Sequence, residues 1–195
     1  MKSIFEQAAN WQQPTVKEVE TIMIKAASNL GCEVKNLYSY FDGDARTFRR
    51  WKENADKNPD QASSIKYSPF ALLVAIASCD VAIEKGQRKA KGGEIIFTEN
   101  KKPLEPVNKE LWQLIQDNYV FTADNFERPS EKIVKFFYGK DSVTGMFRQD
   151  LAAMLGYDKN HFGRLIVRMN FGTWASLMLC MGVPVSRLFD FNKTS

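Results

Sequence analysis

An internal repeat constrains the fold of this chain more than any other feature of its sequence. Residues 65–78, IKYSPFALLVAIAS, align without a gap with residues 169–182, MNFGTWASLMLCMG. Both segments begin with an apolar, a polar and an aromatic residue, followed by two residues that are typical of turns. An aromatic residue, an alanine and the rest of an apolar helix come next. Upstream, residues 41–51 (FDGDARTFRRW) align with residues 155–165 (LGYDKNHFGRL). A repeated supersecondary unit indicates a duplicated module; the alternative is a chance resemblance between amphipathic helices.

Apolar residues recur at helical spacing through both halves of the chain. The clearest helix is expected over 15–30, with Pro14 before it and Gly31 just past its end. Ser68 and Pro69 supply an N-cap and a first-turn proline for a strongly apolar helix expected over 68–85. Further helices are expected over 34–41, 45–57, 108–119, 130–140 and 171–183, and more than one helix is expected within 147–170. The sequence therefore predicts an all-α protein with at least seven helices.

The segment 148–166, RQDLAAMLGYDKNHFGRLI, resembles the helix-turn-helix of the Cro/CI-like repressor superfamily. Its apolar, small and turn positions are Leu151, Ala152, Leu155, Gly156, Phe162 and Leu165. A small residue lets two helices cross closely, and a glycine permits the left-handed turn between them. The later apolar residues bury the second helix against the first. With the repeat, the resemblance implies two helix-turn-helix modules.

The modules are expected at residues 1–84 and 107–195. Between them, residues 85–106 contain turn residues on both sides of the short β-prone run EIIFT. We interpret this segment as a basic linker or a short β-hairpin. Arg88, Lys89 and Lys91, followed by two glycines, form a flexible basic segment that could contact a phosphate backbone; a linker without such contacts is the alternative.

In the second module, the exposed face of the second helix carries side chains that can contact DNA bases. The apolar side of this helix consists of Phe162, Leu165, Ile166 and Met169. A step of 100° per residue then turns Asn160, Arg164 and Val167 outwards. Asparagine and arginine can make bidentate contacts with adenine and guanine. The predicted DNA-binding residues are Arg148, Gln149, Lys159, Asn160, His161, Arg164 and Arg168, a solvated polar face being the alternative.

In the first module, the expected recognition helix lies near residues 45–55, with Asp44 as its N-cap. Phe48, Trp51 and Ala55 form its buried side. Its predicted DNA-binding residues are Arg46, Thr47, Arg49, Arg50 and Lys52. This density of arginines resembles the recognition helices of plasmid and phage regulators. An alternative register places Ala27 and Gly31 at the small and turn positions and turns Lys35, Asn36 and Ser39 outwards.

Composition narrows the function classes. The net charge of +4 suits an anionic partner. Cys32, Cys79 and Cys180 are odd in number and far apart, which argues against a disulfide framework or a zinc knuckle. Because His161 is the only histidine, a catalytic triad or a histidine-rich metal site would depend on that one residue. We expect no enzyme activity, no metal and no cofactor. Without a signal peptide or a spanning segment, the chain is expected in the cytoplasm.

Together these features predict a sequence-specific regulator of transcription, such as a repressor from a plasmid, phage or other mobile element. The partner would be double-stranded DNA, and the resemblance implies a homodimer on an inverted repeat. The rival hypothesis is a protein-binding inhibitor or adaptor, encoded by a phage or plasmid, that uses the same scaffold to bind a host protein.

Overall fold

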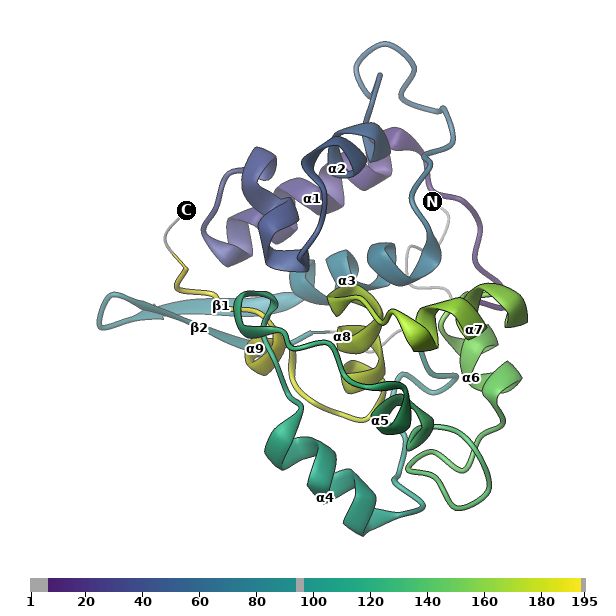
Figure 1. Cartoon of the computed structure of the whole chain (residues 1–195). Helices are drawn as coiled ribbons and strands as arrows, with labels where there is room; N and C mark the ends of the chain where they lie inside the picture. Colours follow the sequence, from purple (N-terminus) through teal and green to yellow (C-terminus); the bar gives the residue numbers. More distant parts are fainter. Residues whose placement is uncertain (1–6, 94–96, 194–195) are drawn as a thin grey trace.

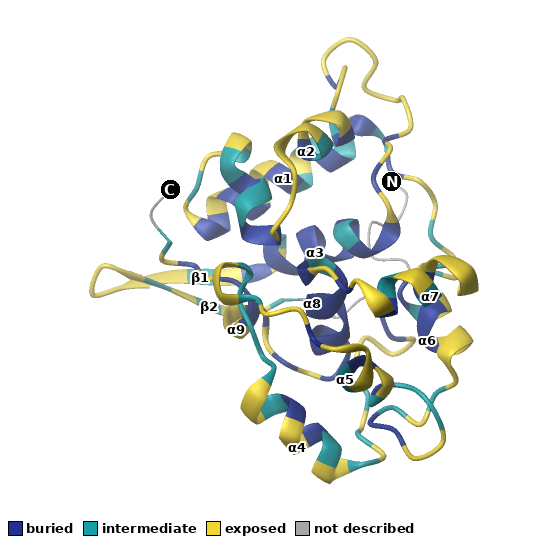
Figure 2. Cartoon of the chain, viewed as in Figure 1, coloured by how far each residue is buried: buried dark blue, intermediate teal, exposed yellow. Residues whose placement is uncertain are grey.

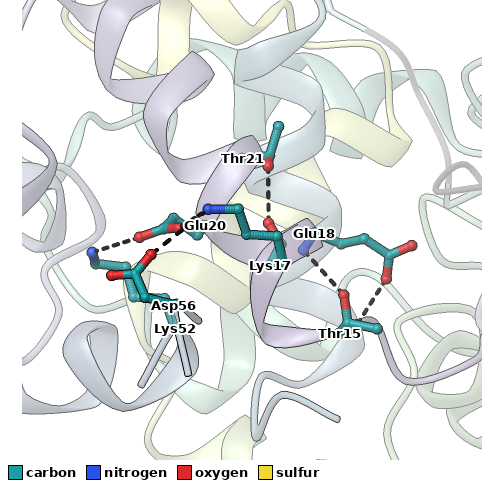
Figure 3. A network of polar contacts seen from close by, with 7 residues as sticks. All are labelled: Thr15, Lys17, Glu18, Glu20, Thr21, Lys52 and Asp56. Carbon is teal, nitrogen blue, oxygen red and sulfur yellow. Dashed lines mark hydrogen bonds and ion pairs between the residues drawn. The ribbon is translucent and has the colours of Figure 1, made fainter. Parts of the chain in front are cut away.

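The first helix, α1 (Val16–Leu30), shows how strongly local sequence sets its ends. At its start the Thr15 hydroxyl accepts a hydrogen bond from the Glu18 amide at 3.1 Å, and the Glu18 carboxylate accepts one from the Thr15 amide at 2.7 Å (Figure 3). This reciprocal capping satisfies two amides that the helix leaves unpaired. The helix ends at Gly31, whose φ of 75° is the left-handed conformation that glycine adopts without strain.

The computed structural model describes residues 7–93 and 97–193, and 48% of these described residues are helical. After α1, the first half contains η1 (Val34–Phe41), a 3₁₀-helix, followed by α2 (Ala45–Trp51) and α3 (Tyr67–Ala77). The prediction of a mostly helical fold is thus confirmed. α2 is shorter than the helix expected near residues 45–55, because the backbone leaves the helical region at its C-cap and turns left-handed two residues later, at Asn54.

A two-stranded antiparallel hairpin follows α3. Its strands are β1 (Cys79–Glu84) and β2 (Gln87–Gly92). They are joined by Lys85 and Gly86, with φ of 52° and 79°. Two successive residues with positive φ form the kind of tight turn whose twist matches that of paired strands. The helix predicted over 68–85 is therefore wrong beyond the end of α3, where the β-branched residues Val81 and Ile83 favour a strand.

The second half is again built from helices. They are α4 (Lys109–Asn118), η2 (Ala123–Asn125), α5 (Glu131–Lys135), α6 (Arg148–Met154), α7 (Lys159–Val167), α8 (Phe171–Cys180) and α9 (Val185–Leu188). α5 covers only part of the helix expected over 130–140. No helix among the described residues is both long and apolar enough to cross a membrane.

Helices α3 and α8, which come from the two repeated segments, lie in contact at the centre of the molecule (Figures 1 and 2). Both are buried along almost their whole length; Phe70 of α3 is 2% exposed and Trp174 of α8 is 0% exposed. One cluster of buried side chains includes residues from both halves. The halves expected at 1–84 and 107–195 are thus packed against each other through a shared core.

Candidate nucleic-acid interface

The two repeats contain three helices each in the same order, although the first is a 3₁₀-helix in one repeat and an α-helix in the other. We call residues 34–78 the first repeat and residues 148–182 the second repeat. In the alignment η1 corresponds to α6, α2 to α7 and α3 to α8. The turn before α2 contains Asp42 with φ of 47°, and the aligned turn before α7 contains Gly156 with φ of 74°. The same left-handed turn therefore separates the first two helices of each repeat.

The second helices of the two repeats also begin in the same way. The Asp44 carboxylate accepts a hydrogen bond from the Thr47 amide at 2.9 Å, and the Asp158 carboxylate accepts one from the His161 amide at 2.9 Å. Each carboxylate also lies where the positive end of the helix favours negative charge. Hydrogen bonds from the Thr47 hydroxyl and amide lower the pKa of Asp44, and a hydrogen bond from the His161 amide lowers the pKa of Asp158. Both caps are thus ionised at neutral pH.

Gly156 is placed where no other residue fits well. A Cβ atom on Gly156 would lie 2.7 Å from Cβ of Tyr67, the first residue of α3. The turn between α6 and α7 therefore touches the first repeat directly, and the left-handed backbone adds its own penalty for a side chain. This contact holds α7 close to the N-terminal end of α3.

The predicted DNA-binding residues of the second repeat lie on the surface. Arg148 and Gln149 are exposed at the start of α6. The exposed residues on and after α7 are Lys159, Asn160, His161, Arg164 and Arg168. Phe162 and Ile166 are buried beneath them, at 0% and 3% exposure. The structure thus brings these polar side chains to the solvent side of one helix pair.

In the first repeat, α2 exposes Arg46, Arg49 and Arg50, while Phe48 and Trp51 are buried beneath them. None of these three arginines forms an ion pair with any residue that the structure describes. The same holds, within the described ranges, for the cations of the second repeat, which are Arg148, Lys159, Arg164 and Arg168. Elsewhere lysines do find carboxylates, as Lys135 does with Glu131 at 2.7 Å. The free arginines are concentrated on α2, α6 and α7.

Lys52, one of the predicted DNA-binding residues, forms an ion pair within the protein. Its ammonium group lies 3.2 Å from the carboxylate of Glu20 on α1, whose side chain is only 14% exposed (Figure 3). Lys17 pairs with the same carboxylate at 2.8 Å, and with Asp56 at 4.0 Å. These contacts fasten the end of α2 to α1 and give Lys52, unlike Arg46, Arg49 and Arg50, an ion-pair partner within the protein.

The basic segment with Arg88, Lys89 and Lys91 is a strand, not a flexible arm. Nη1 of Arg88 donates to the Ser28 carbonyl oxygen at 3.1 Å, and Lys89 pairs with Glu84 at 2.6 Å. Figure 1 shows the hairpin projecting from the opposite side of the molecule from α7. The hairpin also begins earlier than the segment 85–106 in which one was expected. Most of the EIIFT run, residues 94–96, lies outside the described residues.

The elements of the alternative register of the first repeat are also present in the structure. α1 ends at Gly31 in a left-handed turn, and the segment that holds Lys35, Asn36 and Ser39 is the 3₁₀-helix η1, which corresponds to α6 in the alignment of the repeats. Lys35 pairs with Glu33 at 2.8 Å. The second helix of this repeat is α2, which carries the free arginines.

A groove separates α2 from α7. It encloses about 300 Å³ and is lined by both helices and by the N-terminal ends of α3 and α8. Thr47 and Trp51 line it from α2, and His161 and Leu165 line it from α7. The His161 ring stacks on Tyr157, with ring centroids 5.4 Å apart. Sequence reasoning did not identify this groove, although its lining residues occupy aligned positions of the repeat.

The buried thiols have no visible part in a site. Burial raises the pKa of Cys180, and burial raises the pKa of Cys79 to about 11, so both remain protonated thiols at neutral pH. Among the described residues, no group of three or more His, Cys, Asp or Glu could hold a metal ion.

The sequence matches no family model, no curated protein and no solved structure.

Proposed function

We propose that this protein binds double-stranded DNA in a sequence-specific manner and regulates transcription, as a repressor of a mobile element would. The observation that carries the proposal is the shared geometry of α2 and α7. Each is the second helix after a left-handed turn, each begins at an aspartate cap, and each exposes arginine that forms no ion pair with a described residue. Exposed arginine on a rigid helix has both the charge that attracts phosphates and the donors that read guanine.

The exposed residues divide by position into two roles. Arg46 and Arg50 on α2, with Asn160 and Arg164 on α7, lie in the first turns of these helices or one turn further. This is the part of a recognition helix that enters the major groove in helix-turn-helix proteins. The remaining cations of the surface are assigned to phosphates: Arg49, Arg148, Lys159 and Arg168.

A selection from random-sequence duplexes tests this function. The purified chain is incubated with a pool of random 30-base-pair duplexes, the bound fraction is amplified, and the cycle is repeated. We expect one enriched motif. Failure to enrich any motif over several rounds would refute sequence-specific DNA binding.

The salt dependence of binding to the selected duplex is a separate prediction. Four phosphate contacts release condensed cations, so log K should fall against log salt concentration with a slope of roughly −3 to −4. Fluorescence anisotropy at several salt concentrations measures the slope. A slope near zero would contradict the assignment of Arg49, Arg148, Lys159 and Arg168 to phosphates.

A further inference from the structure

The two repeats are related by a two-fold rotation, and the evidence is a pair of reciprocal contacts between α3 and α8. Oγ of Ser68 lies 2.7 Å from Oγ of Ser176. In the alignment Ser68 corresponds to Gly172, and Ser176 corresponds to Leu72. The reciprocal contact is present, because a Cβ atom on Gly172 would lie 3.9 Å from Cδ1 of Leu72. A contact that recurs when the two repeats are exchanged is isologous, as a two-fold rotation requires.

The groove lies on this two-fold axis, as its lining shows. Thr47 faces it from the first repeat, and its counterpart His161 faces it from the second repeat. Trp51 and its counterpart Leu165 both line it, as do Ser68 and Gly172 at the helix N-termini. Helices α2 and α7 therefore stand on either side of the axis, close enough for one groove to touch both.

From this symmetry we infer that one chain occupies one DNA site as an internal pseudo-dimer, and that the site is a compact, imperfect inverted repeat. The inference rests on the proposed function. A two-fold axis of the protein aligns with a two-fold axis of the duplex when two equivalent helices read the two halves of a site. A homodimer supplies this symmetry from two chains, whereas here the two repeats of a single chain supply it.

The site is compact because the two helices share a groove. Two half-sites one helical turn apart need recognition helices about 34 Å from each other. A groove of about 300 Å³ that is lined by both α2 and α7 is much too small for that separation. The halves of the site should therefore adjoin, with no spacer of a helical turn.

The inverted repeat in the DNA is imperfect because the two repeats of the protein differ at residues that contact bases. Arg50 corresponds to Arg164, but Arg46 corresponds to Asn160. Arginine favours guanine and asparagine favours adenine. The halves of the site should match at one position and differ at the other.

Sedimentation of the chain with its selected duplex tests the stoichiometry. At concentrations well above the dissociation constant we expect one chain per duplex, on a motif whose halves adjoin. Two chains per duplex, or half-sites separated by a helical turn, would overturn the pseudo-dimer and leave the proposed function standing. Absence of any selected motif would overturn both.

The R46N variant tests the internal symmetry, because it gives α2 the residue that α7 has at the aligned position. Repeating the selection should change base preference in one half-site only, by roughly 5- to 150-fold at one position, and make the two halves more alike. The stoichiometry should remain one chain per duplex. R187N, which alters an exposed arginine of α9, should select the original motif. If R46N changes both halves equally, or changes neither, the pseudo-dimer is wrong.

Discussion

Trp174→Ala should lower the free energy of unfolding by about 3–5 kcal/mol, because it empties the centre of the shared core. The Trp174 side chain is fully buried, its ring lies 5.4 Å from the ring of Phe137, and Nε1 donates to the Tyr119 carbonyl oxygen at 2.8 Å. Truncation leaves a cavity beside Phe137 and removes the donor of the hydrogen bond to the Tyr119 carbonyl oxygen. Urea unfolding followed by circular dichroism measures the change.

Phe147→Ala is the matched control for this experiment, because Phe147 is an aromatic residue with 67% of its surface exposed. Its effect should stay within about 0.5 kcal/mol. If Trp174→Ala proves too unstable to measure, Trp174→Phe still loses the hydrogen bond and part of the packing. Its free energy of unfolding should lie between those of Trp174→Ala and Phe147→Ala. Equal stability of Trp174→Ala and the wild-type protein would contradict a core centred on α3 and α8.

The double variant Arg50→Ala/Arg164→Ala should lose most of its specific affinity for DNA. These arginines occupy aligned positions on α2 and α7 and have no ion pair with a described residue. Each lost base contact is expected to cost about 1–3 kcal/mol. Two separate contacts add, giving about 2–6 kcal/mol, a loss of roughly 30-fold to 10⁴-fold in affinity. Anisotropy titration of the selected duplex measures this loss.

Arg187→Ala/Lys109→Ala removes the same charge from α9 and α4, where both residues are exposed. Because long-range electrostatic attraction is lost equally in the two double variants, the difference between them isolates the contacts of α2 and α7. A loss of similar size in both would show that only net charge matters. Unchanged binding by Arg50→Ala/Arg164→Ala would mean that these helices do not read the duplex.

Local sequence predicted the helices whose ends carry strong signals. Thr15 and Gly31 define α1, Asp44 caps α2, and the apolar period correctly places Phe48 and Phe162 in the core. In each case a few neighbouring residues contain the whole signal, because capping and amphipathic burial are short-range effects.

The first strand of the hairpin was missed because an apolar helix continues without interruption into β-branched residues. Only the pair Lys85–Gly86, which can adopt two successive positive φ angles, separates the strands. The roles of Lys52 and Arg88 were missed for another reason. Their partners, Glu20 on α1 and the carbonyl of Ser28, lie 32 and 60 residues away in sequence.

The groove and the two-fold axis depend on how α3 meets α8. The sequence alignment shows that two repeats exist, but it contains nothing that distinguishes a rotation from a translation between them. The reciprocal contacts of Ser68 with Ser176 and of Gly172 with Leu72 make that distinction. Long-range packing, not local pattern, therefore positions the candidate site.

Photo-crosslinking to the selected duplex is the most direct test of the claim that α7 lies against DNA. A benzophenone-bearing amino acid is placed at Val167, on the outward side of α7 with 60% exposure, or at Ile83, on the hairpin with 69% exposure. Both positions are similarly exposed, so the probes differ only in location. We expect DNA crosslinks from position 167 and none from position 83. Crosslinks from position 83 alone, with binding intact, would contradict the assignment of the DNA-binding surface to α2 and α7.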